Sequence, residues 1–412
     1  MAMKWGIRFT AVALGIVGAG TASLVHAQNA GCTGGGKMSK QIAKQMSAAK
    51  DAIKVKKWQE VLNRTREATA VPFTRTAFDQ YWIHEFNAYA YHGLGQMGES
   101  AREYENALLS ACMPENGKAE RYKQLANLNY SLKNYQKVVE YANRALKIQR
   151  DPEIMVTLGQ AYYQMKDDKN AMKVMNDVIT SFEQQGRVPK EQQILLVLTS
   201  CQRVGDNNCV TKLFEKLVLH YPKPEYWQNL LSNLMSSSEL DDNQKINVMR
   251  LALTVDVMKK PGQYKEMAQI ALDKGLPGEA QSVLDQAFSK KLFKEQRDID
   301  LNTRLLAKAK GAADMDKPKL AARDAAARAT PTGDDDVQVG AAYLSYGEND
   351  KALEALKRGL AAGTVKEADE AALMLGIAYL KTNNKPEAKK AFGSVKQDPT
   401  MARIAKLWQL NS

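Results

Sequence analysis

The chain has 412 residues, of which 44% are hydrophobic and 25% are charged, and its formal net charge is +12. This composition excludes a disordered chain, and the length fits two or three ordinary domains or one repeat array. The basic residues are spread along the chain beside acidic ones, without a long arginine run. The charge therefore predicts solvated helix faces and no nucleic-acid partner.

Residues 1–27 have the pattern of a signal peptide. Lys4 and Arg8 precede a mostly apolar stretch without charges, and Val25 and Ala27 are the small residues that favour cleavage after Ala27. We therefore expect an exported, soluble periplasmic protein whose mature chain has no transmembrane segment. The alternative is an uncleaved N-terminal anchor, for which the apolar stretch is short and interrupted by glycines.

The stretch GCTGGGKMS at residues 31–39 belongs to a Gly-rich leader over residues 28–38. It fits most of the P-loop pattern, but Met38 stands where a Ser or Thr would hold Mg²⁺, and no strand pattern precedes it. We therefore predict no nucleotide. Cys32 close behind the apolar stretch leaves a lipid anchor as an alternative, although Asn29 stands where such signals have a leucine-like residue. The leader is predicted to be a flexible tether.

From residue 39 onward the sequence repeats itself with a period of roughly 34 residues. The two clearest copies lie at 157–178 and 373–399, and each has a Leu-Gly pair followed by a tyrosine and then an alanine. These residues are Gly159, Tyr162 and Ala171 in the first copy, and Gly376, Tyr379 and Ala388 in the second. A glycine lets two antiparallel helices approach closely, the tyrosine fills the wedge between them, and the alanine occupies the tightest contact.

This pattern resembles the tetratricopeptide repeat (TPR), as found in exported proteins of Gram-negative bacteria. The resemblance implies an all-α fold, a right-handed superhelical solenoid of about eight to ten antiparallel helix hairpins. A C-terminal capping helix is expected at residues 400–410, because the last unit would otherwise expose its stacking face. Looser copies lie at 86–111, 124–148, 196–222, 267–288 and 339–360.

The composition suggests where the array divides. We expect an N-terminal TPR-like array over residues 39–290 and a C-terminal TPR pair with the capping helix over residues 336–412. Between them, residues 291–335 are rich in Ala and Lys with few large apolar residues, and are predicted to form a degenerate helical joint. Within and just beyond this joint, TPTGDDD at residues 330–336 is typical of a loop.

The cysteines offer one disulfide candidate. Cys201 and Cys209 lie on either side of the RVGDNN turn of one hairpin, which predicts Cα atoms within the roughly 4.4–6.8 Å that a disulfide needs. The alternative is two buried thiols, which are common in protein cores. Cys32 and Cys112 could also pair, but nothing in their spacing supports it.

The search for catalytic chemistry is negative. The sequence has four histidines and neither a C-x-x-C nor a G-x-S-x-G motif. His84 and His92 are eight residues apart, which does not match the spacing of a zinc-binding helix. We therefore predict a non-enzymatic protein without catalytic residues, a metal site or a cofactor.

Binding is the better hypothesis, because the first helices of stacked hairpins line a concave face. The repeat frame predicts that the following side chains lie on this face: Trp82, Glu85, Tyr89, His92, Lys123, Asn127, Tyr130, Gln160 and Tyr163. Such aromatic and amide groups suit peptide recognition, whereas the alternative is that Trp82 and Tyr89 pack against a neighbouring hairpin. Lys123 and Asn127 match part of the clamp with which some TPR adaptors hold a carboxyl terminus. Its other positions differ here, so we do not predict that activity.

The resemblance implies a protein–protein interaction scaffold in the bacterial cell envelope, whose partners are envelope proteins or peptides. Some such proteins accompany TonB-type energy-transducing systems or outer-membrane assembly systems. The alternative function is an accessory of periplasmic enzymes or a protein that binds peptidoglycan or polysaccharide in an aromatic groove. The sequence does not distinguish the partner or the pathway.

Overall fold

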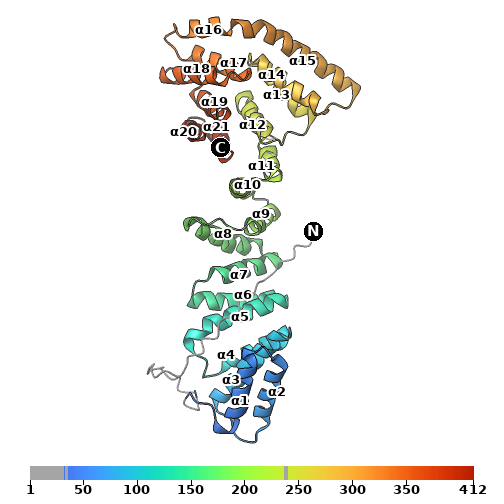
Figure 1. The fold of residues 1–412 in the computed structure, drawn as a ribbon, viewed down its shortest axis with the longest axis vertical. Helices are drawn as coiled ribbons and strands as arrows, with labels where there is room; N and C mark the ends of the chain where they lie inside the picture. Colours follow the sequence, from blue (N-terminus) through green and yellow to red (C-terminus); the bar gives the residue numbers. More distant parts are fainter. Residues whose placement is uncertain (1–31, 33–35, 236–239) are drawn as a thin grey trace. The chain divides into compact units, whose positions relative to one another are not determined.

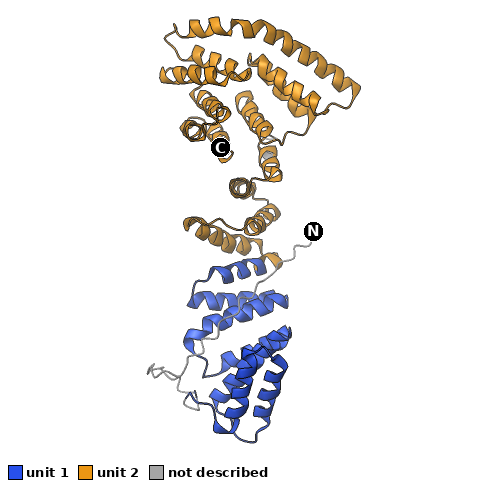
Figure 2. Cartoon of the chain, in the orientation of Figure 1, with its two compact units in different colours: residues 1–161 blue, residues 162–412 orange. Residues whose placement is uncertain are grey.

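A computed structural model describes Cys32, residues 36–235 and residues 240–412. These residues form helices and turns without a strand, which confirms the prediction of an all-α fold of paired helices. They divide into two compact units, one ending at Ala161 and one from Tyr162 to Ser412 (Figure 1, Figure 2). The predicted signal peptide and seven residues of the Gly-rich leader, 28–31 and 33–35, lie outside the described residues.

The first unit is a row of helix pairs. Its helices are α1 (Lys40–Lys54), α2 (Trp58–Ala70), α3 (Ala77–Gly93), α4 (Met97–Leu109), η1 (Glu115–Gly117), α5 (Lys118–Ser131), α6 (Tyr135–Ile148) and most of α7 (Pro152–Gln164). Helices α1 and α2, α3 and α4, and α5 and α6 pack together, and successive pairs are joined by contacts of α2 with α3 and of α4 with α5.

The pairs of the first unit reverse direction at the same kind of turn. Lys56, Gly95 and Lys133 have positive φ angles of 57°, 77° and 60°. The N–H three residues beyond the first helix then donates back to a carbonyl in its last turn, as Asn134 does to Asn129 over 2.8 Å. This bond satisfies a carbonyl that the helix end would otherwise leave unpaired. The turn is thus built even where the left-handed residue is lysine, at a cost of roughly 1–2 kcal/mol.

Asp79 ties the start of the array together. Its carboxylate accepts hydrogen bonds from the Ser39 N–H at 2.9 Å, the Ser39 hydroxyl at 2.5 Å and the Thr76 N–H at 3.0 Å. The Thr76 hydroxyl in turn accepts from the Asp79 N–H, which completes a capping box at the start of α3. One buried carboxylate therefore holds the residue before α1 against the first turn of α3.

The second unit continues the helix pairs. After the end of α7 its helices are α8 (Asp168–Gln184), α9 (Glu191–Val204), α10 (Asn207–His220), α11 (Pro224–Met235), α12 (Asp242–Thr254), α13 (Pro261–Asp273), α14 (Pro277–Ser289), α15 (Gln296–Asp316), η2 (Lys317–Lys319), α16 (Leu320–Ala327), α17 (Asp334–Ser345), α18 (Asn349–Ala361), α19 (Ala368–Lys381), α20 (Lys385–Ser394) and α21 (Pro399–Leu410). Its largest hydrophobic core runs from α8 to α15 and continues in α19 to α21.

Close helix approach at small residues is confirmed in the second unit. A Cβ added to Gly376 in α19 would lie 2.8 Å or less from three carbons of the Phe392 ring in α20. A Cβ on Gly340 in α17 would lie 2.7 Å from Leu356 Cγ in α18. Both partner side chains are at most 2% exposed. These glycines are required because the facing helix leaves no room for a methyl group.

The predicted loop at residues 330–336 is only partly correct. Helix α17 begins at Asp334, so three aspartates of this stretch form the first turn of a helix. Carboxylates are favourable there, because they face the positive end of the helix dipole. The predicted joint contains the long helix α15, which buries only Asn302, Ala309 and Ala313. The domain boundaries at residues 290 and 335 stay a prediction.

The C-terminal helix α21 caps more than the last repeat. It packs on α19 and α20, as expected of a cap, and it also contacts α10 and α12 from much earlier in the chain (Figure 1). Trp408 Nε1 donates to the Asn247 carbonyl at 3.3 Å, and Lys406 Nζ lies 2.9 Å from Glu215 Oε2. The second unit therefore folds back on itself.

Candidate functional site

Helix α3 presents the first group of predicted binding residues. Trp82, Glu85, Tyr89 and His92 are three or four positions apart and so share one side of the helix. Trp82 is half-buried and makes edge contacts with the rings of Tyr81 and Phe86, at centroid distances of 5.3 and 5.6 Å. Tyr89 and His92 are half-buried, and this burial raises the pKa of Tyr89 and lowers the pKa of His92.

Glu85 is buried and engaged within the protein. Its carboxylate lies 2.5 Å from the guanidinium of Arg121 in α5, and the two residues are 5% and 9% exposed. Burial raises the pKa of Glu85 above its usual value, and the charge of Arg121 opposes that rise. Arg121 also lies over the Tyr104 ring, 4.0 Å from its centroid. This pair joins two helices and is not free to bind a partner.

Arg121 is a residue that the sequence analysis missed. It follows Glu85 by 36 positions, which is close to one repeat length. Opposite charges one repeat apart on neighbouring first helices would have indicated a contact between hairpins. Each residue of the pair also has one buried atom without a hydrogen-bond partner among the described residues, Glu85 Oε1 and Arg121 Nε.

Helix α5 presents the second group, and its polar members already have partners. Lys123 Nζ lies 2.7 Å from Asp151 and 2.9 Å from Glu153. Burial acts to lower the pKa of Lys123, but these two carboxylates outweigh it and hold the pKa above its usual value. Asn127 Oδ1 accepts a hydrogen bond of 3.2 Å from Thr157. Both side chains therefore link α5 to the segment around α7.

The remaining predicted residues differ in exposure. Tyr130 is half-buried, with an edge contact to Tyr135 at a centroid distance of 5.7 Å. Gln160 is buried, at 9% exposure. Tyr163 belongs to the second unit, where the guanidinium of Arg203 lies 4.3 Å from its ring centroid. The binding role of all nine residues stays a prediction.

We call the first-unit members of this set the first-helix face: Trp82, Glu85, Tyr89, His92, Lys123, Asn127, Tyr130 and Gln160. Its charged groups are neutralised by neighbouring helices. Its aromatic groups Trp82, Tyr89 and Tyr130 are half-buried. Rings of this kind offer contact area that loses little entropy on binding, because they are already held in place.

The cysteines are joined in two pairs. Cys201 and Cys209 form a disulfide across the turn between α9 and α10, with Cα atoms 5.9 Å apart. Cys32 and Cys112 form a second disulfide, with Cα atoms 4.8 Å apart and a sequence separation of 80 positions. The sequence left this second pair open. It fastens part of the leader to the loop that follows α4.

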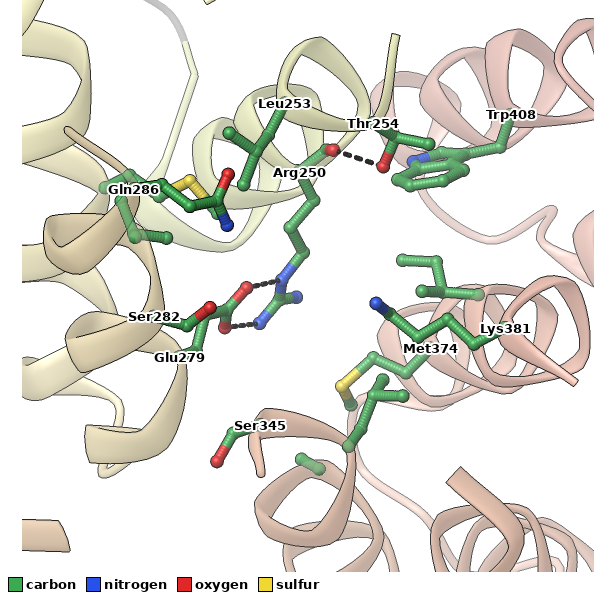
Figure 3. Close-up of a pocket in the computed structure, with 15 residues that line it drawn as sticks. Arg250, Leu253, Thr254, Glu279, Ser282, Gln286, Ser345, Met374, Lys381 and Trp408 are labelled. Carbon is green, nitrogen blue, oxygen red and sulfur yellow. Dashed lines mark hydrogen bonds and ion pairs between the residues drawn. The ribbon is translucent and has the colours of Figure 1, made fainter. Parts of the chain in front are cut away.

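The second unit contains a cavity of about 140 Å³ that the sequence did not indicate (Figure 3). Side chains from α12, α13, α14, α17, α19 and α21 line it. Arg250 of α12 donates to both carboxylate oxygens of Glu279 in α14, at 2.8 and 2.6 Å. Burial acts to lower the pKa of Arg250, but Glu279 outweighs it and raises that pKa.

No group of three or more His, Cys, Asp or Glu side chains in the described part of the chain could hold a metal ion. Across residues 36–235 and 240–412, no helix combines the length and the apolar character that crossing a membrane requires.

Comparison with known proteins identifies the repeat. Residues 152–185 and residues 370–400 each match a family model described as tetratricopeptide repeat. These segments contain the two strongest copies in the sequence, and the models indicate no catalytic family. No curated protein matches the chain.

Several solved structures are similar at low sequence identity. The MamA protein is 13% identical, over 46% of this chain and 96% of its own, with a TM-score of 0.36. A tetratricopeptide repeat protein from Parabacteroides merdae ATCC 43184 is 10% identical, over 90% of this chain and 99% of its own, with a TM-score of 0.33. Because these scores are low, we infer nothing further from them. The family matches establish that this all-helical chain contains tetratricopeptide repeats.

Proposed function

We propose that this chain is a non-enzymatic scaffold that binds partner proteins or peptides on the first-helix face. One observation supports this most directly. Lys123 is paired with two carboxylates, and Trp82, Tyr89 and Tyr130 are half-buried. A rigid surface with aromatic groups and neutralised charges favours contact with a peptide chain over catalysis.

We also propose that the protein works in the cell envelope after export. Two disulfides support an oxidising compartment, since such bonds rarely persist in the cytosol. The Cys32–Cys112 bond also disfavours the lipid-anchor alternative. A sulfur joined to another cysteine cannot at the same time form a thioether with a lipid. Cleavage after Ala27 would leave Cys32 in the mature chain, free to make this bond.

The proposed partner is an envelope protein or peptide. This proposal includes a partner that belongs to a TonB-type or outer-membrane assembly system. The second candidate is binding of peptidoglycan or polysaccharide. It is favoured by the same half-buried rings of Trp82, Tyr89 and Tyr130, since sugar rings also pack on aromatic faces.

A double variant tests the first-helix face. Tyr89→Ala with Tyr130→Ala should reduce the capture of partners from crosslinked envelopes at least about tenfold, in keeping with the loss of two central aromatic contacts. The control is Tyr122→Ala, which removes a tyrosine of α5 whose ring stacks on Tyr141 of α6. Circular dichroism should show equal helicity in all variants. Unchanged capture by the double variant would exclude this face, and micromolar binding of a glycan without any protein partner would favour the second candidate.

A further inference from the structure

The cavity of the second unit is held open by contacts between distant parts of the chain. Helix α21 forms one of its walls and is fixed to α12 by the hydrogen bond from Trp408 to the Asn247 carbonyl. At the start of α12, Gln244 Nε2 donates to Oδ2 of Asp398, the residue just before α21, at 2.8 Å. Both bonds join residues more than 150 positions apart. The cavity therefore exists before any ligand binds, which lowers the entropic cost of binding.

The size of the cavity restricts what it can hold. A volume of about 140 Å³ is close to that of a cavity that accommodates one benzene ring, about 150 Å³. Its walls include Leu253, Val283, Ile377 and Trp408, together with the flexible thioether of Met374. These groups suit one aromatic or branched apolar side chain.

The charged side chains that line the cavity indicate which charge a ligand should carry. Arg250 and Glu279 neutralise each other in a two-point pair, as Figure 3 shows by dashed lines. Lys381 of α19 is exposed at the opening, and its amino group points toward the cavity (Figure 3). Among the residues that the structure describes, Lys381 Nζ has no hydrogen-bond or ion-pair partner. The site thus has one lysine with no described hydrogen-bond or ion-pair partner beside the apolar groups of Leu253, Val283 and Trp408.

We propose that this cavity binds a peptide segment of a partner protein, which inserts one apolar side chain and places a neighbouring carboxylate against Lys381. A peptide fits better than a small free acid, because the cavity holds only one side chain and further contacts must come from its rim. That rim is polar, with Thr254 and Ser282 exposed and Gln286 half-buried. The proposal deepens the scaffold function and rests on it, but it does not depend on the first-helix face of the other unit.

Two small probes test the chemistry of the site. The mature chain is labelled with ¹⁵N-tryptophan, and the indole signal of Trp408 is followed while phenylacetate or its uncharged analogue phenylacetamide is added. We expect phenylacetate to shift this signal with an affinity at least about fivefold better than phenylacetamide, because only the acid can pair with Lys381. Lys381→Met should abolish the difference. Lys385→Met is the matched control, since Lys385 is exposed near the start of α20 and does not line the cavity.

A pair of peptides distinguishes the source of the ligand. The acetylated and amidated peptide Gly-Ser-Phe-Asp-Ser-Gly should bind at least about tenfold more tightly than phenylacetate, because its backbone also contacts the rim. Its Phe→Ser analogue should not bind. If phenylacetate binds as tightly as the peptide, the cavity is a site for small acids and the proposal is wrong.

A blocking variant completes the test. Ala341→Leu places a larger side chain in the cavity wall and should remove binding of the Phe-Asp peptide while the helical signal stays unchanged. Peptide binding that persists in Ala341→Leu, or that Lys381→Met does not weaken, would overturn the proposal. Neither result would affect partner capture by Tyr89 and Tyr130, so the failure of this site and the failure of the scaffold function are separable.

Discussion

Replacing Gly376 by alanine should destabilise the second unit, although alanine is the better helix former. The new Cβ would lie 2.8 Å or less from three carbons of the Phe392 ring, whereas ordinary carbon contacts are about 3.5–4.0 Å. The ring cannot easily retreat, because it is 2% exposed and stacks on Trp408 with centroids 6.0 Å apart. Overpacking of this kind costs about 1–3 kcal/mol, and the helix preference of alanine returns about 1 kcal/mol.

The expected net loss is therefore about 1 kcal/mol, which corresponds to a decrease of roughly 2–4 °C in Tm for a unit of this size. Thermal unfolding followed by circular dichroism measures it. Gly311→Ala is the matched control, because Gly311 lies inside α15 with no atom within 4 Å of an added Cβ. That variant should gain about 0.5–1 kcal/mol. Equal or higher stability of Gly376→Ala would refute the close-approach reasoning. In a Phe392→Leu background the same glycine replacement should cost less.

Three further predictions concern the first unit. Burial acts to raise the pKa of Asp79, but hydrogen bonds outweigh it and hold that pKa below its usual value. Asp79→Asn should therefore cost about 1–3 kcal/mol of unfolding free energy at pH 7. The difference in unfolding free energy between the variant and wild type should disappear as the pH falls below about 4, because the wild-type carboxylate is then protonated. A gap that is equal at both pH values would contradict this. Mass spectrometry of the non-reduced mature protein should find Cys32 linked to Cys112. Replacing both cysteines by serine should lower the free energy of unfolding in urea by about 2–5 kcal/mol. Two alkylatable thiols at these positions in the native protein would refute the bond. Arg121→Met should cost about 3–5 kcal/mol of unfolding free energy, because it leaves the buried carboxylate of Glu85 unpaired. Adding Glu85→Gln should recover much of this loss. Equal stability of Arg121→Met and wild type would show that the pair is not buried.

The helix pairs could be predicted from the sequence because their signals are local. The spacing from Gly376 to Tyr379 and Ala388 already specifies two helices and a turn, and the structure places Gly376 against Phe392 as the pattern requires. The start of α17 at Asp334 was mistaken for a loop, because aspartates favour both turns and the first turn of a helix.

The partners of individual side chains could not be predicted in the same way. Whether Glu85 is exposed or buried depends on Arg121 in the next hairpin, and the repeat frame gives only the side of the helix on which it lies. The cavity requires α21 to return to α12, a contact between Trp408 and Asn247 across 161 positions. No periodicity within one repeat specifies such a contact. The Cys32–Cys112 pair could not be predicted for the same reason, because it joins two positions far apart in the sequence.

The central claim is that the first-helix face binds a protein. A photo-crosslinking amino acid placed at Tyr89 in living cells tests it most directly, with Gln136 as the control position, since Gln136 is an exposed residue of α6. We predict one discrete crosslinked envelope protein from position 89, identified by mass spectrometry, and none from position 136. The absence of any protein product at position 89, or the same product from both positions, would contradict the claim.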